Sequence, residues 1–306
     1  RGTEHGVEVV GYWGEAVSTA DQARALIDAT GAAGLAGDLF VDGALGSHTA
    51  WLCRPYADAP DRAGNCYLDP TVIAEHLSAC TEAGVTAGFH VIGDAAAAAV
   101  VDALEAVVER FGAPAVAGCG HRLEHLEMVS EEQAAKLGAW GIVASMQPNF
   151  DALWGGADGM YARRLGVDRA ARLNPFALLA SAGVPLAFGS DAPVTALDPW
   201  ATVRAAGHHH TPGSAISMRA AFAAATRGAW RAGGVRDGIT GTLVPGAPAS
   251  YAVWETLNLD VAAPADGVAR WSTDPRSRVP ALPRLDPSDP LPRCRQTVHR
   301  GVVLYG

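Results

Sequence analysis

Several residue types are rare in this sequence of 306 residues, and each shortage argues against a class of protein. Lys136 is the only lysine among 23 basic residues, and 32 acidic residues leave a net charge of −9. Nucleic acid and anionic membrane surfaces need clustered cations, so we expect neither as a partner. No apolar run approaches the roughly 18 residues of a membrane-spanning helix, so we expect neither a membrane span nor a signal peptide.

Cysteines are few and show no metal-binding spacing. The chain has five of them, an odd number, and no CxxC pair. Free thiols in a reducing compartment fit this pattern better than disulfides or a cysteine zinc site, so we expect a cytoplasmic protein. The glycines also lack the spacing of a Walker loop or a dinucleotide-binding turn, which argues against an open-sheet oxidoreductase.

The composition is typical of a chain with a large buried core. Hydrophobic residues make up 49% of the sequence and charged residues 18%. The length suits one large domain, or one large domain with a small one. The first residue is Arg1 rather than Met, and the opening segment reads as the middle of a domain. We therefore expect the sequence to be a fragment or a processed product.

Short apolar runs alternate with alanine-rich segments that favour helices. Predicted strands cover residues 7–12, 37–41, 85–91, 121–125, 141–146 and 185–189, and predicted helices cover residues 19–30, 71–83, 95–111, 130–139 and 174–182. Strands that are almost continuously apolar, each followed by a helix, indicate a parallel sheet covered on both faces. Six such units fit either a barrel that lacks two units or an open, doubly wound sheet.

The composition changes after about residue 240. Residues 241–248 are rich in turn-forming residues, residues 249–254 read as a strand, and residues 296–305 read as a hairpin that turns at Arg300-Gly301. Residues 272–292 are dense in Pro, Asp and Arg, which predicts an irregular connection. We therefore predict a partial α/β domain over residues 1–240 and part of a small β-domain over residues 241–306.

Polar residues follow five consecutive strands at the points where the strands end. They are Asp38 and Asp42, His90 and Asp94, Glu124 and His125, Gln147 and Asn149, and Ser190 and Asp191. In parallel α/β folds the carboxyl ends of the strands form the ligand-binding edge. A lone His is more often structural and a Ser-Asp pair more often a helix cap. Two imidazoles and a carboxylate on neighbouring strand ends are nevertheless typical of a divalent-metal site with a position left for water.

An ordered set of motifs extends this interpretation. The strings LFVDGALGSHTAWL, FHVIGDAA, RLEHLE, SMQPN and FGSDAPV occur in that order, and GTLVPGAPASYAVW follows them. From about residue 7 to the end the chain thereby resembles amidohydrolase family 3, a group of metal-dependent hydrolases that includes the D-aminoacylases. The resemblance implies a TIM-type (β/α)8 barrel, here incomplete with strands 3–8, together with the C-terminal strands of a small β-sandwich.

The resemblance also implies roles for individual residues. His90 would be a metal ligand, and His125 would be a second ligand or would polarise the bound water and the substrate carbonyl. Asp191 would be a metal ligand and would shuttle the proton of the attacking water to the leaving nitrogen.

Two features depart from the family's pattern. Relatives carry a His-x-His pair on strand 1, and no such pair lies upstream of the first predicted strand. The run 208–210 contains three histidines, but it follows the last predicted strand and reads as a loop. Many relatives carry a carboxylated lysine on strand 4, where this chain has Asp38, itself a candidate ligand. Because Lys136 lies on a predicted helix, we expect one metal ion, Zn²⁺, rather than a carbamate-bridged pair.

Four further residues are weaker candidates. His48 stands where the family often has a basic residue, so it is a candidate substrate contact or an exposed loop histidine. Gln147 and Asn149 are candidates to line the substrate pocket or to bond to local backbone. Asp94 is a candidate to orient His90 from behind, or to cap the helix that follows it.

The hypothesis from sequence is therefore a metal-dependent hydrolase that cleaves non-peptide carbon–nitrogen bonds in a small-molecule substrate. The alternative is a catalytically incomplete fragment, or a non-catalytic module of the same fold that binds a small molecule or a partner chain. A barrel without its first strands leaves unpaired strand edges, so we expect association with a complementing N-terminal segment or a homo-oligomer.

Overall fold

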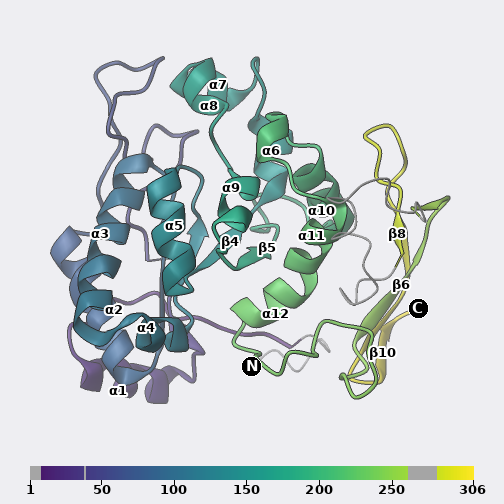
Figure 1. The fold of residues 1–306 in the computed structure, drawn as a ribbon, viewed down its shortest axis with the longest axis horizontal. Coiled ribbons are helices and arrows are strands. Elements are labelled where there is room, and N and C mark those ends of the chain that lie inside the picture. The colour runs from purple at the N-terminus through teal and green to yellow at the C-terminus, as the bar shows by residue number, and fades with distance from the viewer. Residues whose placement is uncertain (1–7, 38, 261–280) are drawn as a thin grey trace.

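A five-stranded parallel sheet forms the centre of the protein, as the computed structural model of residues 8–37, 39–260 and 281–306 shows (Figure 1). Its strands lie side by side in the order in which they occur in the chain. They are β1 Gly34–Leu35, β2 Thr86–Val91, β3 Arg122–His125, β4 Val143–Met146 and β5 Leu186–Phe188. All carboxyl ends therefore lie at one edge of the sheet, which confirms the prediction of a parallel α/β fold.

Helices connect the strands and cover the sheet. The first group comprises α1 Ala20–Thr30, α2 Pro70–Ala83, α3 Asp94–Phe111, α4 Ala113–Cys119 and α5 Glu131–Trp140. After β4 follow α6 Pro148–Trp154, α7 Met160–Leu165, α8 Val167–Ala170 and α9 Phe176–Ser181. After β5 follow α10 Pro199–Gly207, the 3₁₀ turn η2 Pro212–Ser214, α11 Met218–Ala223, the π-helical turn η3 Ala224–Gly228 and α12 Ala229–Ala232. Within the part of the chain that the structure describes, no helix is long and apolar enough to cross a membrane.

Local signals explain where the helices begin and end. Ser130 and Gln133 form a reciprocal capping box at the start of α5, as the Ser130-Glu131 sequence predicted. The Asp69 side chain accepts the Thr71 N–H at the start of α2, and the left-handed Gly84 ends that helix. The five predicted helices agree with α1, α2, α3, α5 and α9 to within a few residues.

The two faces of the sheet differ in character. Side chains on the helix-covered face are apolar and buried, among them Phe89, Leu123 and Met146. The opposite face carries Arg122 and Glu124 on β3 and Ser145 on β4, in register with His90 on β2. Arg122 binds the Glu124 carboxylate through Nε and Nη2 and donates to Ser145 Oγ at 2.9 Å. Strand alternation therefore separates a dry, apolar face of the sheet from a polar one.

Two predicted strands differ from the structure. Residues 8–12 form no strand of their own, although Trp13 N–H bonds to Gly34 O and Ala36 N–H bonds to Trp13 O beside β1. The prediction at residues 37–41 is displaced, because β1 ends at Leu35 and the chain pairs with β2 again only through the Phe40–His90 bridge. Glycine at Gly37, with a φ of 81°, interrupts the extended backbone there.

A second, antiparallel sheet lies beyond residue 250, at the right of Figure 1. It has the order β10-β9-β6, formed by β6 Tyr251–Glu255, β9 Arg293–His299 and β10 Val302–Tyr305, with the hairpin turn at Arg300 and Gly301 as predicted. The short strands β7 Leu259–Asp260 and β8 Leu282–Pro283 pair with each other, and β8 lies within residues 272–292, which were predicted to be irregular. The remainder of that segment up to residue 280 lies outside the described residues.

Burial of His121 predicts a pH dependence of stability. Its side chain is 1% exposed, accepts the Ala87 N–H at Nδ1 and contacts Thr81 Oγ1, and burial lowers its pKa to about 4. In the unfolded chain the pKa of His121 is near 6.5. The unfolded chain therefore binds this proton at a higher pH than the folded chain does. Lowering the pH from 7.5 to 5 is expected to cost about 2 kcal/mol of unfolding free energy from this group.

Urea unfolding at several pH values checks this expectation. The variant His121→Gln has no titratable group at the position, so its stability should fall less over the same interval even if it is less stable at pH 7.5. An equal pH dependence in both proteins would contradict the assignment.

Candidate functional site

Two histidines from neighbouring strands meet at the carboxyl edge of the parallel sheet. His90 comes from β2 and His125 ends β3, and their ring centroids lie 4.5 Å apart at an interplanar angle of 68°. Both side chains are buried. The pairing of β2 with β3, which sets Val91 opposite His125, brings together two residues that are 35 positions apart in the chain. The predicted convergence of these two imidazoles is therefore present.

Hydrogen bonds to oxygen atoms define which nitrogen of each ring carries a proton. His90 Nε2 lies 3.0 Å from the carbonyl oxygen of Gly43, and His125 Nδ1 lies 2.8 Å from Oε1 of Gln147. A carbonyl oxygen can only accept, so each of these nitrogens donates. In the neutral rings the lone pair is then on Nδ1 of His90 and Nε2 of His125. Metal-binding histidines in proteins are typically oriented in this way, by a donor bond from the other ring nitrogen.

The backbone at His125 is strained. The backbone φ angle is 73° at His125 and 46° at Leu126. Both angles lie in the left-handed region, which residues other than glycine rarely adopt. The His125 ring also stacks on Phe150 of α6, with centroids 5.7 Å apart and an interplanar angle of 12°. Strained residues held by their surroundings are concentrated at functional sites. The orientation of this ring is therefore enforced by packing as well as by Gln147.

Asp42 is a site residue whose importance the sequence analysis missed. Its fully buried carboxylate accepts the backbone N–H groups of Trp51, Ile92 and Gly93, and Oδ1 lies 4.0 Å from Nε2 of His90. Burial raises its pKa to about 6, although the three N–H groups act in the opposite direction. The sequence feature that could have indicated this role is the position of Asp42 directly after an apolar run, in the string FVDG.

Asp94 was a candidate to orient His90 or to cap the helix that follows it, and its contacts agree with the second of these alternatives and not with the first. Its carboxylate accepts the N–H groups of Cys53 and Ala95, because Asp94 is the first residue of α3 and its side chain stays at the helix terminus. Beside the His125 ring, His90 contacts the Gly43 carbonyl and the Asp42 carboxylate, and the Phe40 ring lies 4.4 Å from it. Asp42 therefore occupies the position beside His90 that the first alternative gave to Asp94.

The two amides at the end of β4 are buried beside the histidine pair. Gln147 is the hydrogen-bond partner of His125, and its Nε2 lies 3.4 Å from the carbonyl oxygen of Ser145. Asn149 donates from Nδ2 to Thr202 Oγ1 on α10 at 3.2 Å. Gln147 thus orients a histidine, while Asn149 ties α6 to α10. Their contact with substrate stays a prediction.

His48 lies in a separate ion-pair network. Its Nε2 is 2.9 Å from the Asp58 carboxylate, which also binds Arg164, and its ring contacts that of Tyr56 edge-on at 4.8 Å. These partners anchor the loop that holds residues 44–50. The recognition of substrate by His48 stays a prediction.

Of the two carboxylates predicted as ligands, Asp191 and Asp38, the structure describes only Asp191. Asp191 lies in an exposed turn three residues after β5, with a φ of 55°. Across residues 8–37, 39–260 and 281–306, no three His, Cys, Asp or Glu side chains stand close enough together to hold a metal ion. Asp38 lies outside the described residues. The described side chains therefore bring the two imidazoles together without completing a three-donor site.

The histidine run and the single lysine have other partners. His208 Nε2 bonds to the carbonyl oxygen of Leu285, and His210 Nδ1 lies 3.1 Å from the buried Asp151 carboxylate. His209 is buried beside the same carboxylate. Lys136 on α5 pairs with Glu105 and Glu132. As predicted, the run lies in a loop after α10, and the lysine lies on a helix outside the sheet.

Comparison with known sequences identifies a family. A sequence profile of the amidohydrolase family matches residues 4–305. The protein LONG AFTER FAR-RED 3 of Arabidopsis thaliana is 32% identical over 238 residues, which are 73% of this chain and 40% of that protein. YtcJ of Bacillus subtilis (strain 168), named as a candidate amidohydrolase, is 32% identical over 171 residues, 55% of this chain and 30% of YtcJ.

Solved structures are also similar. An uncharacterized metal-dependent hydrolase from Pyrococcus furiosus is 29% identical with a TM-score of 0.55, over 63% of this chain and 39% of that one. Another, from Pyrococcus horikoshii OT3, is 25% identical with a TM-score of 0.58, over 70% of this chain and 45% of that one. The chain thus aligns with less than half the length of these relatives.

Proposed function

We propose that this chain, which belongs to amidohydrolase family 3, acts in a metal-dependent hydrolase that cleaves carbon–nitrogen bonds in small amides or cyclic amides. The observation that carries the proposal is the His90–His125 ring contact of 4.5 Å, with one nitrogen of each ring bound to an oxygen acceptor. The similar Pyrococcus structures are named as metal-dependent hydrolases, which supports the same chemistry here.

The two imidazoles fit a divalent metal as ligands through Nδ1 of His90 and Nε2 of His125. Imidazole nitrogen is a preferred donor for Zn²⁺, and we propose one zinc ion. When bound, the ion supplies a water molecule acidified toward neutral pH and polarises the substrate carbonyl. Asp191 and Asp38 are the proposed carboxylate ligands. Because no three donors converge among the described residues, we propose that Asp191, Asp38 and a complementing segment supply the ligands beyond the two imidazoles.

Each remaining site residue has a proposed part in the reaction. Gln147 and the Gly43 carbonyl hold the two rings in the ligating tautomers, and Asp42 beside His90 adds negative charge that favours a cation. Asp191 accepts the proton of the attacking water and transfers it to the leaving nitrogen. His48, Gln147 and Asn149 are the proposed contacts for a small-molecule substrate.

We further propose that the parallel sheet is part of a (β/α)8 barrel. The support is the sequential strand order, the polar face that carries Arg122 and Glu124, and the similarity to the Pyrococcus hydrolases. The proposed partners are a segment that carries further strands or a second copy of the chain, and neither nucleic acid nor a membrane.

A catalytically incomplete or non-catalytic binding module is the second candidate. The finding that favours it is that the part of the chain described by the structure contains no group of three metal-binding side chains. Such a module would bind a small molecule in the same place without turnover. It predicts no tightly bound metal in the purified protein.

Metal analysis of the full-length protein separates these two functions. We expect about one zinc ion per chain in the wild type, and at least about a tenfold loss in His90→Ala and His125→Ala, because each variant removes one of few ligands. His299→Ala is the matched control, since His299 contacts Glu8 and Ser250 beside the second sheet. Equal metal content in all four proteins would contradict the site, and absence of metal from the wild type would favour the binding module.

A further inference from the structure

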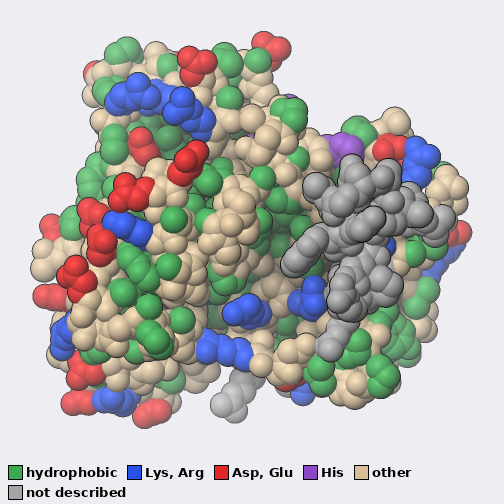
Figure 2. All heavy atoms as spheres, viewed as in Figure 1, with side chains coloured by type: hydrophobic (Ala, Val, Ile, Leu, Met, Phe, Trp, Pro, Cys, Tyr) green, Lys and Arg blue, Asp and Glu red, His purple; other side chains and the backbone are tan. Residues whose placement is uncertain are grey.

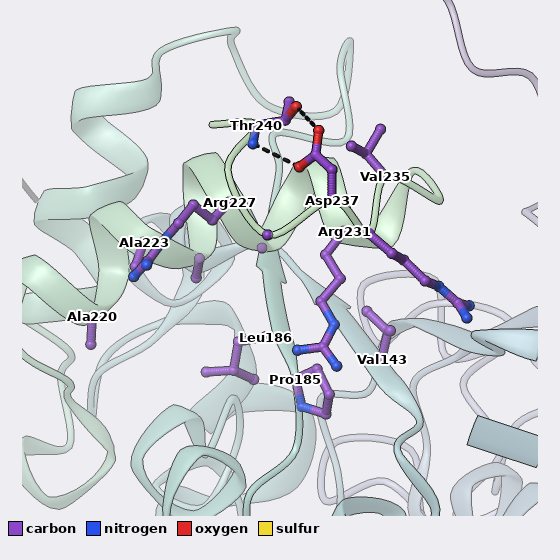
Figure 3. A pocket seen from close by; sticks show the side chains of 14 residues that line it. Val143, Pro185, Leu186, Ala220, Ala223, Arg227, Arg231, Val235, Asp237 and Thr240 are labelled. Atoms are coloured by element: carbon purple, nitrogen blue, oxygen red, sulfur yellow. Dashed lines mark hydrogen bonds between the residues drawn. The ribbon is translucent and has the colours of Figure 1, made fainter. Parts of the chain in front are cut away.

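A cavity lies at the amino ends of the parallel strands, opposite the end that carries the histidine pair. Val143 and Leu186, the first residues of β4 and β5, form its floor, whereas Gln147 and Asp191 follow the last residues of the same strands. Its volume is about 600 Å³. The α11–α12 segment and residues 235–240 form the other walls (Figure 3). The cavity is therefore separate from the proposed hydrolytic site.

Three arginines line this cavity in a chain whose net charge is −9. Arg227 lies in the π-helical turn and Arg231 in α12, four positions further along the same helical segment. Among the described residues, neither guanidinium forms a hydrogen bond or an ion pair with a protein group. Figure 3 shows Arg231 extending toward Pro185 and Arg227 lying on the side of Ala223, and basic side chains gather around α12 in Figure 2.

Acidic groups at the cavity do not neutralise these charges. Asp237 is the single acidic residue of the lining, and its carboxylate accepts the N–H groups of Ile239 and Thr240 and binds the Thr240 hydroxyl. Arg236, the third arginine, donates to the carbonyl oxygen of Gly118. The cavity therefore keeps a local excess of positive charge from Arg227 and Arg231.

The helical wall of the cavity has an irregular backbone. Residues Ala224–Gly228 form a π-helical turn between α11 and α12, a rare feature that is frequent at functional sites. Gly228 allows this turn to lie directly against β5, since a Cβ atom at Gly228 would come within 2.2 Å of the carbonyl oxygen of Leu186. The wide turn and the close approach together place Arg227 and Arg231 at the cavity.

Most of the remaining lining is apolar. It includes the side chains of Val143, Pro185, Leu186, Ala220 and Val235. An anion that fits this cavity therefore carries an apolar body next to its charged group. Two guanidinium groups balance a doubly negative group, and arginine binds phosphate oxygens in paired hydrogen bonds.

We propose that this cavity binds a small phosphate monoester with an apolar body, through Arg227 and Arg231. The site lies outside the hydrolytic machinery and does not depend on the proposed function. Its ligand offers the two guanidinium groups charge-assisted contacts, while the apolar walls bury the ligand's body.

Isothermal titration of the 306-residue chain with phenyl phosphate tests the proposal. At pH 8 and low salt we expect saturable binding at one site, weakened by added NaCl because the contacts are ionic. Binding should also weaken below about pH 6, where a phosphate monoester loses its second charge. Arg227→Gln and Arg231→Gln should each weaken binding by about tenfold, as expected for the loss of a charge-assisted hydrogen bond.

Two controls make the outcome decisive. Arg172→Gln removes an exposed arginine outside the cavity and should bind phenyl phosphate as the wild type does. Benzyl alcohol, a neutral molecule of similar shape, should not compete. Absence of saturable binding, equal binding by all variants, or equally good binding of benzyl alcohol would each overturn the proposal. Because none of these measurements involves hydrolysis or metal content, their failure leaves the proposed enzyme function untouched.

Discussion

Replacing Glu124 by alanine is expected to lower the free energy of unfolding by about 3 kcal/mol. Glu124 and Arg122 form a two-point ion pair on the polar face of the sheet, with side chains only 17% and 15% exposed. Although burial acts against the charge, the Glu124 carboxylate holds the pKa of Arg122 above its usual value. Removing the carboxylate leaves a buried cation with only Ser145 Oγ, the Ala232 carbonyl and the Tyr12 ring as partners.

A double variant distinguishes this mechanism from simple loss of packing. Arg122→Met combined with Glu124→Leu removes both charges and keeps the volume, so it should be considerably more stable than Glu124→Ala alone. Urea unfolding at pH 7.5 measures all three proteins. A loss of less than about 1 kcal/mol of unfolding free energy in Glu124→Ala would contradict this prediction, because it would mean that water solvates the ion pair.

Replacing Gly93 by alanine is expected to cost about 3 kcal/mol or more, because the site around it has no room. A Cβ atom there would lie 1.9 Å from the carbonyl oxygen of Trp51 and 2.8 Å from its nitrogen. The Gly93 N–H also bonds to Asp42, and Ala95 N–H bonds to Trp51 O. The methyl group would thus push the loop at Trp51 away from the start of α3 and disturb the bonds that hold Asp42 beside His90.

Gly118→Ala is the matched control for this variant. A Cβ at Gly118, within α4, meets no atom within 4 Å, so alanine should be neutral or slightly stabilising there. Thermal unfolding of both variants gives the comparison. Similar melting temperatures for Gly93→Ala and the wild type would contradict the close contact with Trp51.

The strands and helices that the sequence predicted correctly are those with a strong, continuous pattern. Residues 85–91 and 141–146 are apolar runs flanked by glycines and agree with β2 and β4. The pattern fails near residues 7–12 and 37–41, where apolar residues form isolated backbone contacts beside β1 and β2. Periodicity reports which residues become buried, and it carries no information on whether a neighbouring strand completes the hydrogen bonds.

The candidate site was predictable where it depends on position along a strand. His90 and His125 end adjacent strands, so parallel pairing alone brings them together. Asp42 was named as a strand-end residue without a role, and the two alternatives for Asp94 could not be separated, because the difference between these aspartates is a loop conformation. Residues 51–53 fold back over the start of α3, so that Trp51 N–H meets Asp42 while Cys53 N–H meets Asp94. No spacing in the sequence reports such a fold-back.

The cavity at the other end of the strands was not predictable either. Arg227 and Arg231 lie in an alanine-rich helical segment for which the sequence analysis made no prediction, and the π-helical turn that places them has no sequence signature.

The lone lysine has a practical consequence for studying the protein in solution. Among its side chains, reagents that acylate amines have one target, the ε-amino group on α5, which lies in the outer helical layer (Figure 1). Hydrogen bonds that Lys136 donates to Glu105 and Glu132 raise its pKa, so its neutral, reactive form is scarce at neutral pH. A fluorophore attached there under mildly alkaline conditions would report on the whole molecule from a known position without touching the histidine pair or the arginine cavity.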